Sequence, residues 1–187
     1  MASEIRGSDN FDSGKAVLQT VSVLTTAQGT QALTATTEVV VTGLTIDVVP
    51  RGANSKFLIQ ARQFGESANA EGNVYNILQD GTRVNIGGSA LSYAGLSMAA
   101  QTYGGAQNNS STPEILTLST LVSTSSVVGT TITFALAISS ATSKTLYLNR
   151  CVSAPTTGFE VGSSEIIVTE IGAYYVRFIK GYIRVIW

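Results

Sequence analysis

The stretch GLTIDVVPRGANSKFLI, residues 43–59, alternates apolar and polar residues, stops alternating at residues 50–55, and then continues as a second apolar run. Alternation with a period of two is typical of a β-strand with one buried face. Pro50 has no amide to give to a ladder, and Gly52 and Asn54 tolerate the positive φ of a tight connection. We therefore predict two strands joined in a scaffold hairpin, with Lys56 keeping the edge of the second strand soluble.

The rest of the chain repeats this pattern of short β-branched segments bounded by Gly, Asn, Ser or Pro. The predicted strands are residues 16–24, 38–41, 44–49, 56–64, 73–79, 82–86, 114–122, 131–139, 144–149, 164–171 and 174–187. Asp80-Gly81 predicts a tight hairpin. Residues 91–105 contain helix formers, but glycines interrupt them, and a buried strand or a loop fits equally well. One strand about every ten residues predicts an all-β, antiparallel β-sandwich or jelly roll.

The composition points to a surface with little charge. Of the 187 residues, 44% are hydrophobic and only 12% are charged, about half the usual charged share. Such a chain needs a neutral polar surface or a surface hidden in an oligomer. The net charge of −1 gives no electrostatic reason to expect nucleic acid or an anionic membrane as a partner.

The charge and the pattern divide the chain into three parts. We predict a polar N-terminal arm at residues 1–14, one β-domain at residues 15–173, and an aromatic extension at residues 174–187. Residues 1–173 hold 8 basic and 12 acidic side chains, whereas the last 14 residues hold three basic side chains and no acid. The sequence shows no charged-then-apolar secretion pattern and no apolar stretch of membrane-spanning length. We therefore expect the protein to be made in a cytoplasm and not to be exported by the common signal route.

The sequence offers little for catalysis. It has no histidine, which removes the Ser-His-Asp and Cys-His systems and most zinc sites. Cys151 is interpreted as a small, partly buried thiol. Spacing does not bring together any pair of carboxylates for glycoside hydrolysis, for which the candidates are Glu66, Glu71, Asp80 and Glu114. The acids Asp9 and Asp12 could attract calcium but lack the distal glutamate of an EF-hand loop, so no cofactor or metal is expected.

Three segments are candidate contact sites. The last segment is rich in aromatic and arginine residues, which is typical of an interface; the residues singled out are Tyr175, Arg177, Phe178, Arg184 and Trp187. In the arm, Asp9, Phe11 and Asp12 are expected to contact a neighbour. In the irregular region, Tyr93, Tyr103, Asn108 and Asn109 suit stacking on a sugar and recognition of its hydroxyls.

Four segments together show a resemblance. They are DNFDSGKAVLQTVSV (9–23), VTGLTIDVVPRGANSKFLI (41–59), TFALAISSATSKTLYLNR (133–150) and SEIIVTEIGA (164–173). In this order they resemble bacteriophage virion proteins of marine and cyanobacterial phages, whose strands end in similar "EIGA" motifs. The resemblance implies a trimeric jelly roll of the tumour-necrosis-factor and complement-head type. This chain departs from it by continuing for 14 residues after Ala173.

The resemblance and the composition predict a non-enzymatic virion protein that is made in the host cytoplasm and assembles as a homotrimer. As a capsid decoration or cement protein it would bind other virion proteins, such as the major capsid protein. The alternative is a tail-fibre tip that recognises a carbohydrate on the host surface. A depolymerase acting through paired carboxylates is the third and weakest hypothesis.

Overall fold

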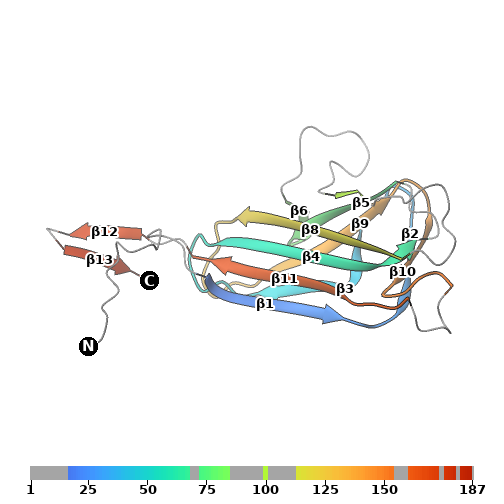
Figure 1. Cartoon of the computed structure of the whole chain (residues 1–187). Helices are drawn as coiled ribbons and strands as arrows, with labels where there is room; N and C mark the ends of the chain where they lie inside the picture. Colours follow the sequence, from blue (N-terminus) through green and yellow to red (C-terminus); the bar gives the residue numbers. More distant parts are fainter. Residues whose placement is uncertain are drawn as a thin grey trace, which may run out of the picture.

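The computed structural model describes residues 17–67, 72–84, 99–100, 113–153, 160–172, 175–179 and 182–186. Within these residues all regular structure is β-strand, and every ladder between strands is antiparallel. The predicted all-β class is confirmed, and the strands form two packed sheets and a separate hairpin (Figure 1).

The first sheet has six strands. Strands β1, β11, β4 and β8 lie side by side in that order. Strand β10 pairs with the last residues of β4, on the same side of β4 as β11, and pairs with β2 on its other side. The bounds are β1 Val17–Thr25, β2 Gly29–Leu33, β4 Lys56–Ser67, β8 Glu114–Ser123, β10 Lys144–Leu148 and β11 Ser164–Ile171.

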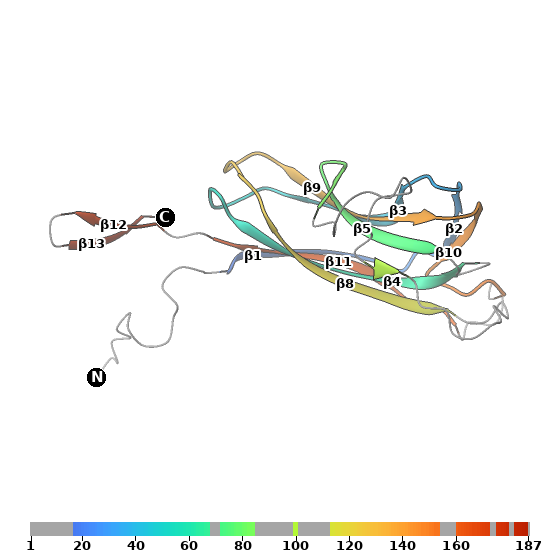
Figure 2. The ribbon, with the colours of Figure 1, turned by 90° about the horizontal axis from the view of Figure 1, so that it is seen from above.

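The second sheet has five strands in the order β3, β9, β5, β6, with β7 also paired to β5. The bounds are β3 Val39–Val48, β5 Asn73–Gln79, β6 Thr82–Arg83, β7 Ala99–Ala100 and β9 Ile132–Ser140. Figure 2 shows this sheet lying over the first one as a second layer. The core between the layers includes Phe57 and Phe134, whose ring centroids are 5.4 Å apart.

The segment at residues 43–59 is not a hairpin, and this prediction was wrong. Its first strand, β3, pairs with β9, whereas its second strand, β4, pairs with β11, β8 and β10 in the other sheet. Residues 49–55 therefore form a corner between the sheets. Lys56 does not start an edge strand either, because it lies opposite both Ile171 and Ser123. Two apolar faces that meet across a core produce the same alternation as two neighbouring strands.

Other boundaries also differ from the prediction. The strands expected at 38–41 and 44–49 are one strand, β3, with an irregular register between Val40 and Thr45 and a φ of 82° at Gly43. At this irregularity glycine adopts the left-handed conformation without strain. The predicted tight turn at Asp80-Gly81 is confirmed, with φ values of 48° and 79°. Strand β2 was not predicted, and β7 lies within residues 91–105, for which a buried strand was one of the alternatives.

The C-terminal segment forms its own two-stranded sheet. Strands β12 (Tyr175–Ile179) and β13 (Tyr182–Ile186) pair with each other, and Ile179 opposite Tyr182 leaves two residues for the connection. In Figures 1 and 2 this hairpin lies beyond one end of the sandwich. The strand prediction for residues 174–187 thus corresponds to two strands within residues 175–186 that pair with each other, and the pair extends neither sheet of the sandwich.

The end of the sandwich away from this hairpin has a polar interior. The Nδ2 of Asn73 donates to Ser67 Oγ at 2.8 Å, and the hydroxyl of Tyr75 donates to Gln63 Oε1 at 3.2 Å, so both bonds cross between the sheets. Burial, and secondly the carboxylate of Glu114, raise the pKa of Tyr75 well above its usual value. Among the described residues Glu114 Oε2 is buried without a hydrogen-bond partner.

Candidate functional site

The chain enters and leaves the sandwich at the same end. Val17, the first residue of β1, lies opposite Ile171, the last residue of β11. The hairpin follows β11 after a short connection (Figure 1). We call this the hairpin end; it consists of Val17, the loop at 49–55, the loop at 124–131 and Gly172.

A buried carboxylate organises the hairpin end. Glu170 is 0% exposed. It accepts hydrogen bonds from the backbone amide of Arg51 at 2.9 Å and from that of Gly52 at 2.9 Å. It also accepts from Ser55 Oγ at 2.7 Å and from Gln19 Nε2 at 2.6 Å. Strand β1, the corner loop and strand β11 are thereby fixed to one side chain.

These hydrogen bonds set the charge state of Glu170. Burial alone would raise the pKa of its carboxyl group, but the bonds from Ser55, from the Arg51 and Gly52 amides and from Gln19 outweigh burial and hold the pKa below the usual range. Glu170 is therefore a buried carboxylate at neutral pH. Its role is to position a loop, since its hydrogen-bonding capacity is used within the fold.

The corner loop is also fixed to the loop at 124–131. The amide of Ser55 donates to Ser126 Oγ at 3.0 Å, and the amide of Asn54 donates to the carbonyl of Ser126 at 3.1 Å. Asn54 has the predicted positive φ, at 55°, but Gly52 does not. A Cβ at Gly52 would instead lie 2.8 Å from both Leu18 Cδ1 and Ser55 Oγ, so glycine is needed for close packing. The start of β1 is joined to them, because Arg51 Nη1 donates to the carbonyl of Leu18 at 3.2 Å. The two loops and the start of β1 form one rigid platform.

The platform carries exposed apolar side chains. The exposed fractions are 64% for Val17, 50% for Val49, 64% for Val127 and 57% for Val128. Sequence reasoning missed all four, because valine in a strand-rich chain is normally assigned to the core. The sequence did carry a signal for Val127 and Val128, which lie between the predicted strands at 114–122 and 131–139, and for Val49, which directly precedes the strand-breaking Pro50. Exposed apolar residues gathered on a rigid platform are typical of a contact surface.

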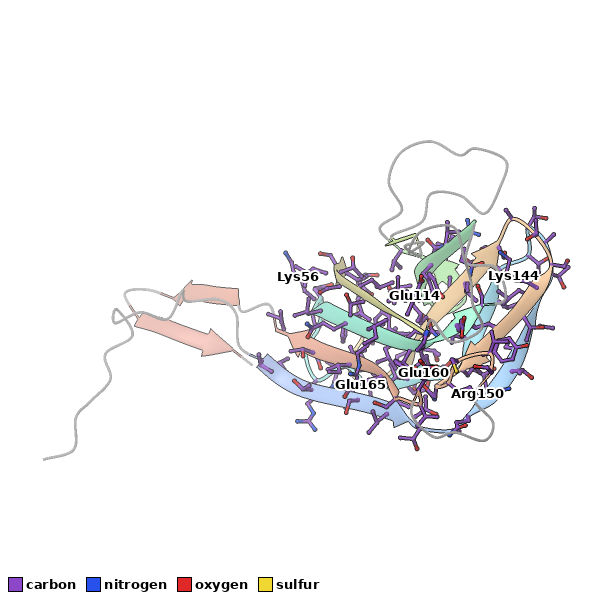
Figure 3. The ribbon with its side chains drawn as sticks, turned by 45° about the vertical axis from the view of Figure 1, so that its right-hand side comes forward. Lys56, Glu114, Lys144, Arg150, Glu160 and Glu165 are labelled. Carbon is purple, nitrogen blue, oxygen red and sulfur yellow. The ribbon has the colours of Figure 1, made fainter. Side chains whose placement is uncertain are left out.

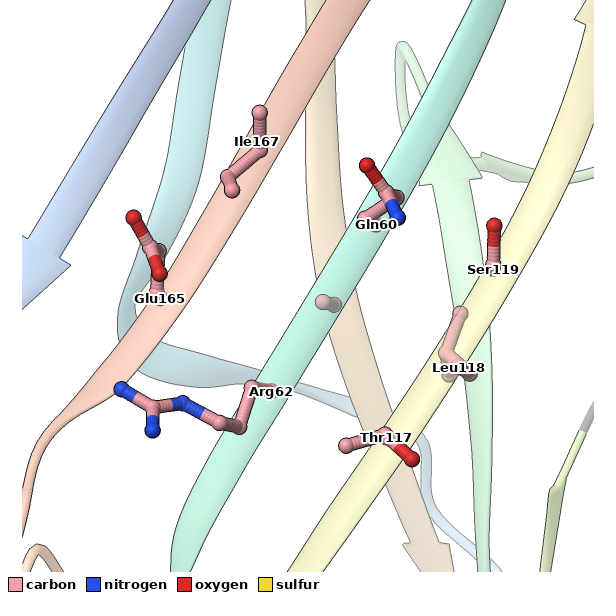
Figure 4. A pocket seen from close by; sticks show the side chains of 8 residues that line it. Gln60, Arg62, Thr117, Leu118, Ser119, Glu165 and Ile167 are labelled. Atoms are coloured by element: carbon pink, nitrogen blue, oxygen red, sulfur yellow. The ribbon is translucent and has the colours of Figure 1, made fainter.

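The outer face of the six-stranded sheet is the second candidate surface. A shallow groove of about 310 Å³ lies across β11, β4 and β8 (Figure 4). Its lining residues are Gln60, Ala61, Arg62, Thr117, Leu118, Ser119, Glu165 and Ile167. Arg62 extends towards β11 and donates from Nη2 to Ser163 Oγ at 2.9 Å. Arg62 and Glu165 are register partners but form no ion pair with each other.

Apolar side chains surround this groove. Leu24 on β1 is 59% exposed, Ile115 on β8 is 59% exposed and Leu121 on β8 is 47% exposed. Figure 3 shows Glu165 among the side chains of this sheet, with Lys56 towards the hairpin end. The face is thus largely apolar or uncharged.

Several predicted site residues lie outside the described residues. These are Asp9, Phe11 and Asp12 of the arm, Tyr93, Tyr103, Asn108 and Asn109 of the irregular region, and Trp187. Tyr175, Arg177, Phe178 and Arg184 lie in the hairpin, where Arg177 is directly opposite Arg184.

The residues considered above for catalysis or metal binding make contacts within the fold. Cys151 is buried, with Sγ 3.6 Å from Ser153 Oγ. Glu66 is buried and accepts from the amide of Val152 at 2.7 Å, and Asp80 accepts from the amide of Thr133 at 2.9 Å. Within the described residues, histidine, cysteine and acidic side chains form no group of three that would suit a metal ion. The same residues contain no helix long and apolar enough to cross a membrane.

No protein-family model matches the chain, and no curated protein matches it by sequence.

Proposed function

We propose that this chain is a non-enzymatic structural protein of a bacteriophage particle, a homotrimeric jelly roll that decorates or cements the capsid surface. The observation that carries the proposal is the hairpin end. There a platform fixed by Glu170 presents four exposed valines and continues into a separately paired hairpin. A decoration protein needs segments outside its own core that can bind neighbouring proteins of the particle.

The strand order supports a jelly roll. When β2, β7 and β10 are set aside and the other eight sandwich strands are counted along the chain, one sheet runs 1-8-3-6 and the other 2-7-4-5. This alternation of strands between the two sheets is the order of two interleaved Greek keys. Jelly rolls of this kind occur in viral capsid and lectin domains.

The outer face of the six-stranded sheet is the surface that we propose for trimer contacts. Its exposed Leu24, Ile115 and Leu121 would be covered, and Arg62 of one copy would meet Glu165 of the next. An oppositely charged pair at the centre of a mainly apolar face favours one orientation of the partner.

Sedimentation with a matched pair of variants tests the trimer. Ile115→Lys places a charge on the proposed contact face, whereas Val40→Lys places the same charge on the second sheet, at a valine that is 40% exposed. We expect trimers at micromolar concentration for the wild type and for Val40→Lys, and monomers for Ile115→Lys. A wild-type protein that sediments as a monomer would contradict the trimer.

The position in the particle is tested by reconstruction of virions. We expect this chain on the capsid surface, with its hairpin end against the major capsid protein after assembly in the host cytoplasm. Density for this chain only at the tail tip would replace the capsid proposal with the receptor-binding alternative.

The groove across β11, β4 and β8 favours the second candidate function, a tail-fibre tip that recognises a carbohydrate. Gln60, Arg62 and Glu165 are planar polar side chains, each of which can form paired hydrogen bonds with neighbouring sugar hydroxyls. A tail-fibre tip could bind a host glycan there, provided that the groove is not covered in a trimer. Binding on a glycan array that is lost in Gln60→Ala would support this function, and an array without binders would remove it.

A further inference from the structure

Strand β1 is an edge strand that lacks the usual protection against further pairing. It pairs with β11 on one side, and the residues that the structure describes place no strand on its other side (Figure 1). Its sequence, VLQTVSVLT, contains no charged residue and no proline. Charges, prolines and bulges are the features with which native proteins keep edge strands from pairing with other chains. The irregularity in its register lies at its start, between Val17 and Gln19, so residues 19–25 present a regular edge.

Strand β3, an edge strand of the other sheet, is better protected. Gln31 Nε2 donates to the carbonyl of Val40 at 2.7 Å, and Gln31 Oε1 accepts from the amide of Thr42 at 3.0 Å. The glutamine side chain thereby occupies backbone groups of β3 that a further strand could use. The register of β3 is also irregular between Val40 and Thr45, and Asp47 adds a charge to the strand. By this comparison β1 is the more accessible edge.

The ends of β1 are held in place. Arg51 Nη1 donates to the carbonyl of Leu18 at 3.2 Å, and Asn149 Nδ2 donates to the carbonyl of Thr25 at 3.2 Å. Among the described residues, no side chain forms a hydrogen bond with the backbone of the residues between these two. An edge that is already ordered loses little conformational freedom when a partner strand binds, which lowers the cost of pairing.

The side chains of β1 alternate between the core and the outer face. Val21 and Val23 are partly buried against the core. Thr20, Ser22 and Leu24 lie on the outer face and are exposed, Leu24 by 59%. The edge thus combines unused backbone groups with apolar side chains that are only partly covered.

We propose that β1 binds β1 of a second copy of this chain in an antiparallel pair centred on Ser22, so that the six-stranded sheets of the two copies become one continuous sheet. The pair with β11 is regular over the seven residues Gln19–Thr25, and Ser22 is the middle one. A two-fold axis at Ser22 therefore uses the whole regular edge and leaves out the irregular start.

The sequence of β1 is complementary to itself in this register. Residues that lie opposite each other in an antiparallel pair point to the same face. Val21 lies opposite Val23 of the second copy on the core side, and Thr20 lies opposite Leu24 of the second copy on the outer side. The pair covers the valines further and buries no charged group.

This contact does not depend on the trimer or on the particle. It joins the edges of two sheets, whereas the trimer contact proposed above covers an outer face. Two paired strands of this length bury less than the roughly 1,200 Å² of a stable interface. We therefore expect the pair at concentrations near 1 mM, or where copies are held side by side, and not at micromolar concentration.

Disulfide trapping tests the register with two matched variants. In Ser22→Cys the new thiols of two copies lie directly opposite each other. In Thr20→Cys, an exposed position of the same face, they lie four residues apart along the strands, about 13 Å, which is too far for a disulfide. Both variants also carry Ile115→Lys, which removes the proposed trimer contact, and the parent Ile115→Lys chain with its buried Cys151 shows the background.

We expect Ser22→Cys to form covalent dimers at least about tenfold faster than Thr20→Cys when about 0.5 mM protein is oxidised. Equal rates in the two variants would overturn the proposal, because thiols that meet by random collision do not distinguish the two positions.

Hydrogen exchange tests the pair without a new thiol. In an antiparallel ladder every second residue of β1 turns its amide away from β11, and these amides have no strand partner in a single copy. In Ile115→Lys we expect exchange of these amides in residues 19–25 to be about tenfold slower at about 0.5 mM than at about 5 μM. Equally fast exchange at both concentrations would overturn the proposal. Equally slow exchange would also overturn it, because a segment of the same chain would then cover the edge.

Discussion

Two carboxylates at opposite ends of the sandwich, Glu170 and Glu114, differ in their hydrogen bonding. At the hairpin end Glu170 accepts from Arg51, Gly52, Ser55 and Gln19, whereas at the far end one oxygen of Glu114 is buried without a partner among the described residues. A buried carboxylate that is fully hydrogen-bonded fixes the groups around it, and a partly bonded one does not. The difference indicates that Glu170 fixes the segments around it and that Glu114 does not; at the far end the buried carboxylate that accepts from a backbone amide is Glu66.

The largest effect should come from removing the acceptor at the hairpin end. Glu170→Ala leaves the Arg51 and Gly52 amides and the Ser55 hydroxyl without their acceptor. We expect a loss of about 3 kcal/mol in the free energy of unfolding, measured by urea denaturation. A loss below about 1 kcal/mol would mean that the corner loop is held by other contacts.

A smaller effect should follow from filling the space at Gly52. In Gly52→Ala the new Cβ would lie 2.8 Å from Leu18 Cδ1, whereas in Gly29→Ala its nearest neighbour is Leu148 Cδ1 at 4.0 Å. We expect Gly52→Ala to lower the free energy of unfolding by about 1–3 kcal/mol and Gly29→Ala to change it by less than about 1 kcal/mol. Equal thermal midpoints for the two variants would show that the platform is loosely packed.

The stability contributed by Glu170 should depend on pH. Its folded-state pKa is lowered, so the contribution is complete above the unfolded-state pKa of about 4.3 and is lost as the pH falls through the folded-state value. The difference in unfolding free energy between wild type and Glu170→Gln should therefore be constant from pH 7 to about pH 5 and shrink below about pH 4. A difference that grows on acidification would contradict this assignment.

The smallest effect is expected at the far end. Glu114→Gln should change the free energy of unfolding by less than about 1 kcal/mol, because one carboxylate oxygen has no hydrogen bond to lose. The substitution should also bring the pKa of Tyr75 somewhat closer to its usual value, although burial, the larger cause, remains. Absorbance of the phenolate during alkaline titration measures this shift. A loss as large as that of Glu170→Ala would remove the contrast between the two ends.

Sequence reasoning predicted the strand class and most strands, because alternation in segments such as Leu44–Val48 directly reflects one buried face. It failed where pairing depends on distant residues. The alternation of residues 43–59 does not reveal whether the two strands are neighbours in one sheet or face each other across a core, and the structure shows the second arrangement.

The platform was the least predictable part of the candidate site. Glu170 and Arg51 are 119 residues apart in the chain, and no local pattern links them. Both lie in segments that carried the resemblance, as does Gln19, so those segments converge on one hydrogen-bonded cluster. The hairpin was predicted as a contact segment from its composition, but its like-charged pair became visible only with the register.

The proposed function requires that the chain attach to a phage particle through the hairpin β12–β13 and the hairpin end beside it. The most direct measurement is the number of copies retained on purified particles for the full-length chain and for a chain truncated after Ala173. Because the hairpin extends neither sheet, the truncated chain should keep the thermal midpoint of the sandwich. We expect it to be lost from the particles. Retention of the truncated chain at full occupancy would contradict the claim.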